Sequence, residues 1–123
     1  MAAGTTVVDF VARGDSPDEW KLVLVEQGPW NDPVEANLRR LQDRLYGCLD
    51  AALDGQVAEK FPESKGKKVT IRLDCYNVPR EPVSEFFDKF SSGALSIPDY
   101  REALGKSPFV KEFGFEITFD SIH

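Results

Sequence analysis

Two acidic residues lie inside predicted strands, and they are the first candidates for chemistry in this sequence. Asp9 interrupts the run 7–12, and Asp74 lies in the alternating segment 69–75. Aspartate is depleted in strands, so its presence there usually has a reason. Two such carboxylates in one pocket could act as general acid and general base. The alternative, which the sequence favours, is that each points to solvent from the outer sheet face or discourages edge pairing.

Three aromatic residues are candidate binding residues. Trp30 stands just before a predicted helix, where its ring either packs on the first turn or anchors a partner. Tyr46 and Tyr76 each fall off the main apolar face of the element predicted to carry them, and rings with a polar tip are common at interfaces. The candidate binding residues are therefore Trp30, Tyr46, Tyr76, Asp9 and Asp74.

The sequence lacks the residues of the common enzyme templates. His123 is the only histidine, so a histidine-based triad and a multi-histidine metal site are not expected. The glycines are isolated, and none opens a helix directly after a strand as a phosphate-binding loop does. Cys48 and Cys75 both fall where an apolar side chain is expected, which favours reduced core thiols. We therefore predict no catalytic residue, no metal and no cofactor.

Charge and composition limit the classes of partner that the chain is expected to bind. Fifteen Lys and Arg against 21 Asp and Glu give the 123-residue chain a net charge of −6. This charge disfavours nucleic acid and anionic membranes and attracts a basic protein, although modest acidity also serves solubility alone. The first residues lack the features of a signal peptide, and no run is long enough to span a membrane. The predicted location is the cytoplasm.

The N-terminal part predicts two strands and a long helix. Runs 7–12 and 20–25 are rich in strand-forming residues, and the turn formers between them favour an antiparallel hairpin. Asp32, Pro33 and Glu35 have the chemistry of a helix start with a capping box. An apolar stripe follows at helical spacing, and Gly55 is well placed to end the helix: Val34, Leu38, Leu41, Leu45, Cys48, Leu49 and Ala52.

The remaining sequence predicts a strand at 69–76, a helix around 83–90, a short helix at 98–104 ended by Gly105, and a strand at 115–120. This order favours a single α+β domain over residues 1–123. Its core would be a small antiparallel or mixed four-stranded sheet (β-β-α-β-α-β) with helices packed mainly on one face. The spatial order of the strands does not follow from the sequence.

The strand pair, Trp30 before the helix cap, the helical segment 41–46 and the segment 55–62 leading to strand 69–71 resemble a small bacterial family of unknown function. The resemblance spans roughly residues 7–78. The family pattern has one histidine ahead of the tryptophan and another inside the helix, where this chain has Gln27 and Asn37. The resemblance implies a bacterial, cytosolic protein and supplies no activity.

Three functions remain open from the sequence. The first is a non-catalytic domain that binds a basic protein, for example an immunity protein that neutralises a cationic toxin. The second is a self-associating structural or accessory domain, a homodimer formed through an apolar edge strand or the Phe-rich helix. The third is a small-molecule binder or enzyme, which requires Asp9, Asp74 and Tyr76 to converge in one pocket.

Overall fold

The computed structural model describes residues 10–31 and 33–119. The chain begins with an antiparallel pair, β1 (Phe10–Arg13) and β2 (Glu19–Gln27). The turn between them closes where the amide of Gly14 donates to the carbonyl of Glu19 at 2.8 Å. The predicted hairpin is therefore confirmed, and the predicted residues 7–9 of its first strand lie outside the described part.

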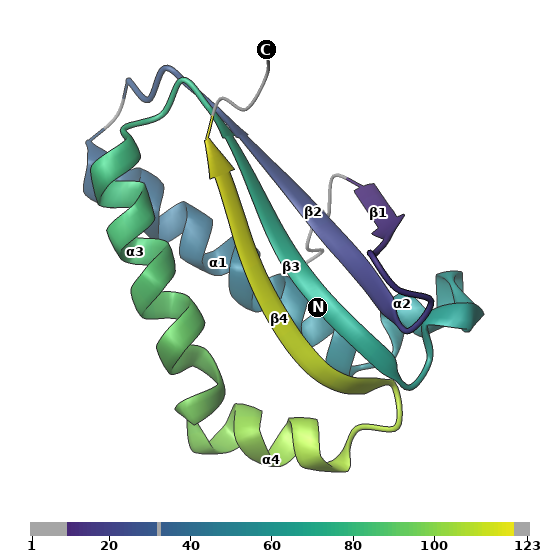
Figure 1. Cartoon of the computed structure of the whole chain (residues 1–123). Coiled ribbons are helices and arrows are strands. Elements are labelled where there is room, and N and C mark those ends of the chain that lie inside the picture. The colour runs from purple at the N-terminus through teal and green to yellow at the C-terminus, as the bar shows by residue number, and fades with distance from the viewer. Residues whose placement is uncertain (1–9, 32, 120–123) are drawn as a thin grey trace.

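The other two strands extend the sheet in parallel. β3 (Lys67–Tyr76) pairs with β2, and β4 (Val110–Phe119) pairs with β3, giving the order β1-β2-β3-β4 (Figure 1). Each parallel connection contains a long helix: α1 (Val34–Leu53) links β2 to β3, and α3 (Arg80–Gly93) links β3 to β4. Parallel neighbours require such crossovers. The predicted α+β fold with a mixed four-stranded sheet is confirmed.

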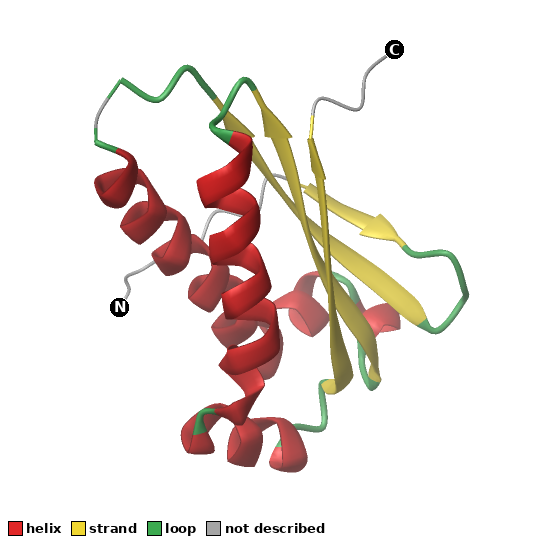
Figure 2. Ribbon diagram, turned by 60° about the vertical axis from the view of Figure 1, so that its left-hand side comes forward, coloured by secondary structure: helices red, strands yellow, loops and turns green. Residues whose placement is uncertain are grey.

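The long helices cover a single face of this sheet. Figures 1 and 2 both show α1 and α3 on the same side. The predicted stripe of α1 supplies buried Leu41, Leu45, Cys48, Leu49 and Ala52, and α3 supplies Val83, Phe87 and Phe90. These side chains meet the inner face of the sheet, whose fully buried residues include Leu22, Leu24, Val69, Ile71 and Leu73. Cys48 and Cys75 are both buried in this core, where an apolar side chain was predicted.

Short helices join the main elements. α2 (Gln56–Lys60) follows Gly55, which has the left-handed φ of 91° expected at the end of α1. α4 (Pro98–Lys106) precedes β4 and packs more lightly than the others, because none of its residues is buried. No helix in the described part of the chain is long and apolar enough to cross a membrane.

Several predicted boundaries were wrong. α4 continues through Gly105 to Lys106, because glycine is tolerated in the last turn of a helix. β4 begins at Val110 rather than at residue 115, and the missed part contains a register irregularity beside Lys67 and Lys68 that breaks the regular alternation. Pro33 directly precedes α1 without a side-chain cap, and the predicted cap residue Asp32 lies outside the described residues.

Candidate functional site

The outer face of the sheet holds Asp74, which was predicted as a candidate acid or base. Asp74 is only 8% exposed, so the expectation that it points to solvent was wrong. Its Oδ1 accepts hydrogen bonds from Arg72 Nε at 2.7 Å and from Thr118 Oγ1 at 2.8 Å. The carboxylate is thus held by its neighbours within the sheet. Asp9, the proposed second carboxylate, lies outside the described residues.

Charged side chains on this outer face form a cross-strand network. Lys21 Nζ lies 3.1 Å from Glu116 Oε2, and Arg72 Nη1 lies 3.3 Å from the same oxygen. At the N-terminal end of β2, Glu19 accepts a hydrogen bond from the Thr70 hydroxyl. This bond holds the pKa of the Glu19 carboxyl below its usual value, although partial burial acts in the opposite direction. Tyr76 is half-buried two residues after Asp74 on the same strand. The cations and carboxylates of this network pair with one another, so it is best explained as cross-strand stabilisation.

Trp30 lies in the connection between β2 and α1 and packs against the core. The Arg40 guanidinium carbon is 5.9 Å from the centroid of its ring, and the indole Nε1 is buried with no hydrogen-bond partner among the described residues. Half-burial and core contact favour the packing interpretation of Trp30 over the anchor interpretation.

Glu26 forms a buried charge cluster with two arginines of α1. The carboxylate is 3% exposed, and it accepts hydrogen bonds from both Nη atoms of Arg40 at 2.8 Å and from Nη1 of Arg44. Burial alone would raise the pKa of Glu26, but these hydrogen bonds and the two positive charges outweigh it and hold the pKa below its usual value. Asn37 Oδ1 accepts a further bond from Arg40 Nη2 at 3.1 Å. The cluster fastens α1 to the end of β2.

Tyr46 contacts Tyr100, a residue that was not among the predicted candidates. Tyr46 is half-buried on α1, and its ring stacks on Tyr100 of α4 with a centroid separation of 5.4 Å. The Tyr100 hydroxyl donates a hydrogen bond to Asp50 Oδ1 at 2.8 Å. Burial, reinforced by this bond and by the charge of Asp50, raises the pKa of Tyr100. The phenol is therefore neutral at physiological pH and fixed against α1.

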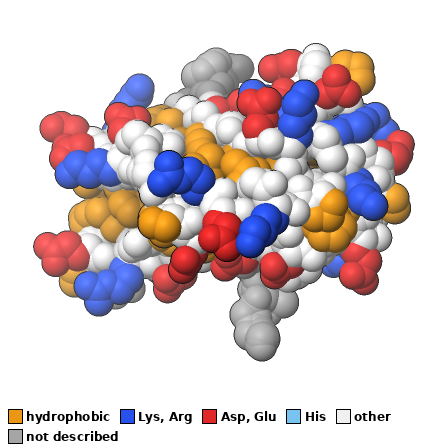
Figure 3. Space-filling model, turned by 90° about the horizontal axis from the view of Figure 1, so that it is seen from below, with side chains coloured by type: hydrophobic (Ala, Val, Ile, Leu, Met, Phe, Trp, Pro, Cys, Tyr) orange, Lys and Arg blue, Asp and Glu red, His pale blue; other side chains and the backbone are white. Residues whose placement is uncertain are grey.

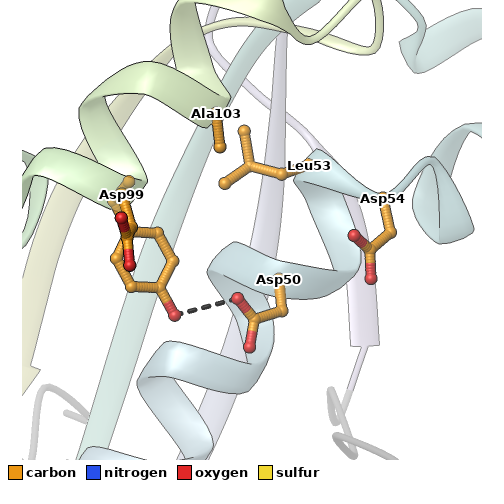
Figure 4. A pocket seen from close by; sticks show the side chains of 6 residues that line it. Asp50, Leu53, Asp54, Asp99 and Ala103 are labelled. Carbon is orange, nitrogen blue, oxygen red and sulfur yellow. Dashed lines mark hydrogen bonds between the residues drawn. The ribbon is translucent and has the colours of Figure 1, made fainter.

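A pocket of about 290 Å³ lies between the C-terminal turns of α1 and the helix α4, beside Tyr100 (Figure 4). Leu53 of α1 and Ala103 of α4 form one apolar end. Carboxylates line the rest, with Asp50 on α1, Asp54 immediately after its last residue, and Asp99 on α4. The lining therefore combines an apolar end, one aromatic ring and three acidic side chains.

The three pocket carboxylates lie at exposed positions, unlike the buried Glu26 and Asp74 of the sheet. Asp50, Asp54 and Asp99 make no ion pair with any residue that the structure describes, whereas Glu26, Asp74 and Glu116 all do. Asp54 Oδ2 accepts only a long hydrogen bond of 3.5 Å from Gln56 Nε2. Unpaired charge of one sign around a cavity concentrates the local potential. A positively charged group is therefore the occupant whose charge complements this lining.

No group of three or more His, Cys, Asp or Glu side chains among the described residues is arranged to hold a metal ion, the pocket aspartates included. Figure 3 shows the end of the molecule where α4 lies, with acidic and basic side chains interspersed between small hydrophobic patches. The surface at this end is therefore of mixed charge and is not uniformly acidic.

The four predicted candidates that the structure describes do not form one site. Asp74 and Tyr76 lie on the outer sheet face, whereas Tyr46 packs between helices on the other side. Of these described residues only Tyr46 contacts a residue that lines the pocket, because its ring stacks on Tyr100. A sequence signal for the pocket did exist, because Asp50 and Asp54 are four residues apart at the end of a predicted helix and so share one face. The contribution of α4 had no such signal.

Comparison with known proteins gives one match. A family model described as a family of unknown function (DUF6572) matches residues 1–97. No curated protein and no solved structure matches the chain. The matched segment ends at Ile97, immediately before α4 begins at Pro98. It therefore contains the α1 side of the pocket and not the α4 side.

Proposed function

Because the chain belongs to the family of unknown function DUF6572, which supplies no activity, we propose from the geometry that it is a non-catalytic domain that binds a basic protein partner at the α1–α4 pocket. One observation carries this proposal: three carboxylates without an ion-pair partner among the described residues line a single pocket, whereas the buried Glu26 and Asp74 are paired with arginine. The net charge of −6 adds long-range attraction for a basic surface.

The structure gives the enzyme hypothesis little support. Asp74 accepts two hydrogen bonds from its neighbours in the sheet, and Tyr76 lies two residues further along the same strand. A general acid or base needs access to a substrate. The proposed specific role is that of a bacterial, cytosolic immunity-like protein, which would block a cationic toxin by covering its basic surface.

The test is affinity capture at low and then physiological salt, with mass spectrometry of the eluted proteins. The pocket variant D54N/D99N removes two of the three carboxylates and leaves the Tyr100–Asp50 contact in place. The matched control E35Q/D88N removes the same charge from exposed positions that make no side-chain ion pair among the described residues.

The proposal predicts that the wild type and the control retain a basic protein that the pocket variant loses, and that salt releases it. An identical set of proteins on the pocket variant and the control would overturn the proposal, because the binding would then depend on net charge or on another surface.

A further inference from the structure

The pocket has a size and a lining that define its occupant more closely than a basic surface does. Sites for drug-sized ligands usually enclose roughly 300–1,000 Å³, so a cavity of about 290 Å³ suits one side chain better than a cofactor. Its apolar end, formed by Leu53 and Ala103, does not match a compact hydrated ion. It matches the aliphatic stem of a long side chain, which packs on apolar surface while its charged head stays among polar groups.

The wall formed by Tyr100 strengthens this assignment. Its ring is held by two contacts, the stack on Tyr46 at 5.4 Å and the hydrogen bond to Asp50 at 2.8 Å. A ring fixed in this way is a preorganised surface for a cationic side chain. Asp54, at the C-terminal end of α1, and Asp99, in the first turn of α4, have no ion-pair partner among the described residues, so a head group between them gains charge-assisted hydrogen bonds.

We infer that this cavity receives a single lysine or arginine side chain of the partner, with the stem against Leu53 and Tyr100 and the head between Asp54 and Asp99. This inference rests on the proposed function and names the group that the partner presents. α4 determines the specificity, because it supplies Asp99 and Tyr100 and lies beyond the segment matched by the family. The matched segment alone contains only one side of the cavity.

The direct test is an NMR titration of the whole chain with Nα-acetyl-arginine amide and Nα-acetyl-lysine amide. Nα-acetyl-citrulline amide, which has nearly the shape of the arginine probe without the charge, is the neutral control. We expect saturable shifts of the Asp54, Asp99 and Tyr100 amide signals, with a dissociation constant in the millimolar range, equivalent to about −4 kcal/mol. The citrulline probe should produce no saturable shift.

The same variants serve as controls. D54N/D99N should weaken binding of the arginine probe at least fivefold, and E35Q/D88N should leave it within twofold. Dispersed amide spectra of both variants establish that they are folded. Equal responses to arginine and citrulline, or equal weakening in both variants, would overturn the inference.

The outcome separates this inference from the proposed function. Partner capture that depends on Asp54 and Asp99, without saturable binding of either cationic probe, would reject the anchor and leave the docking surface in place. Saturable probe binding without any captured partner would instead support the pocket and reject the proposed protein-binding function.

Discussion

The Tyr100 hydroxyl donates a hydrogen bond to Asp50 at 2.8 Å, and this bond, together with the stack of the ring on Tyr46, joins the lightly packed helix α4 to α1. Y100F removes the bond and keeps the ring that stacks on Tyr46. We expect a loss of about 1 kcal/mol in the free energy of unfolding and faster hydrogen exchange in α4. Urea denaturation and amide exchange measure the two effects.

Tyr46 provides the matched control, because its ring occupies the same stack and its hydroxyl has no hydrogen-bond partner among the described residues. Y46F should change the unfolding free energy by less than about 0.5 kcal/mol. If Y100F and Y46F behave alike, the hydrogen bond does not hold α4 in place.

Much of the fold can be predicted from sequence periodicity. The remaining parts could not be predicted, and there is a physical reason for this. The apolar stripe of α1 and the apolar alternation in β3 each turn one face to the core, so the type and orientation of these two elements are determined locally. Strand order depends on which strands pair in space, which no local pattern records. The pocket depends on the docking of α4 against α1, a long-range contact between Tyr100 and Asp50 that propensity does not encode.

The same limitation explains the incorrect expectation for Asp74. Alternation correctly places this residue on the outer face of β3, but its burial arises from side chains on the same strand and on β4, Arg72 and Thr118. Such cross-strand partners are known only once register is known. The buried cluster of Glu26 was missed for a related reason, since its two arginines come from the next element in the chain.

The buried cluster of Glu26 should make stability depend on acid pH. The native pKa of Glu26 lies below the ordinary value of 4.5, so the unfolded chain binds its proton more readily. The stabilisation is therefore complete above about pH 5 and is lost as the pH falls through the lowered pKa. E26Q should reduce stability at pH 7 by roughly 2–4 kcal/mol, because Arg40 and Arg44 lose a buried charge partner.

Urea denaturation between pH 3 and pH 7 checks this prediction. The wild type should lose more stability than E26Q over that range, so the two curves converge at low pH. The exposed pair of Glu85 and Lys89, separated by 4.0 Å, supplies the control. E85Q should change stability by less than about 0.5 kcal/mol. Parallel curves for the wild type and E26Q would contradict the assigned pKa direction.

Asp74 offers a test of its structural role. D74A leaves the Thr118 hydroxyl without its acceptor and deprives Arg72 of one of its two partners, so we expect a loss of roughly 1–3 kcal/mol. D74N keeps an acceptor oxygen and should lose about 1 kcal/mol. Thermal denaturation distinguishes the two variants. If D74A were as stable as the wild type, the hydrogen bonds of Asp74 would not stabilise the sheet. That result would restore the functional interpretation of this carboxylate.

Two glycines at helix ends should respond in opposite directions to alanine. Gly55 has a φ of 91°, and an added Cβ would lie 2.8 Å from the ring of Phe109, so G55A introduces both backbone strain and a steric clash. We expect a loss of roughly 1–3 kcal/mol. Gly93 has a φ of −109° and no atom within 4 Å of the added Cβ. G93A should therefore gain about 0.5 kcal/mol by restricting the unfolded chain. The urea concentrations at half-unfolding of the two variants measure both effects, provided that the unfolding free energy depends equally steeply on urea in each. A destabilised G93A would show that the end of α3 requires glycine for a reason other than backbone conformation or space.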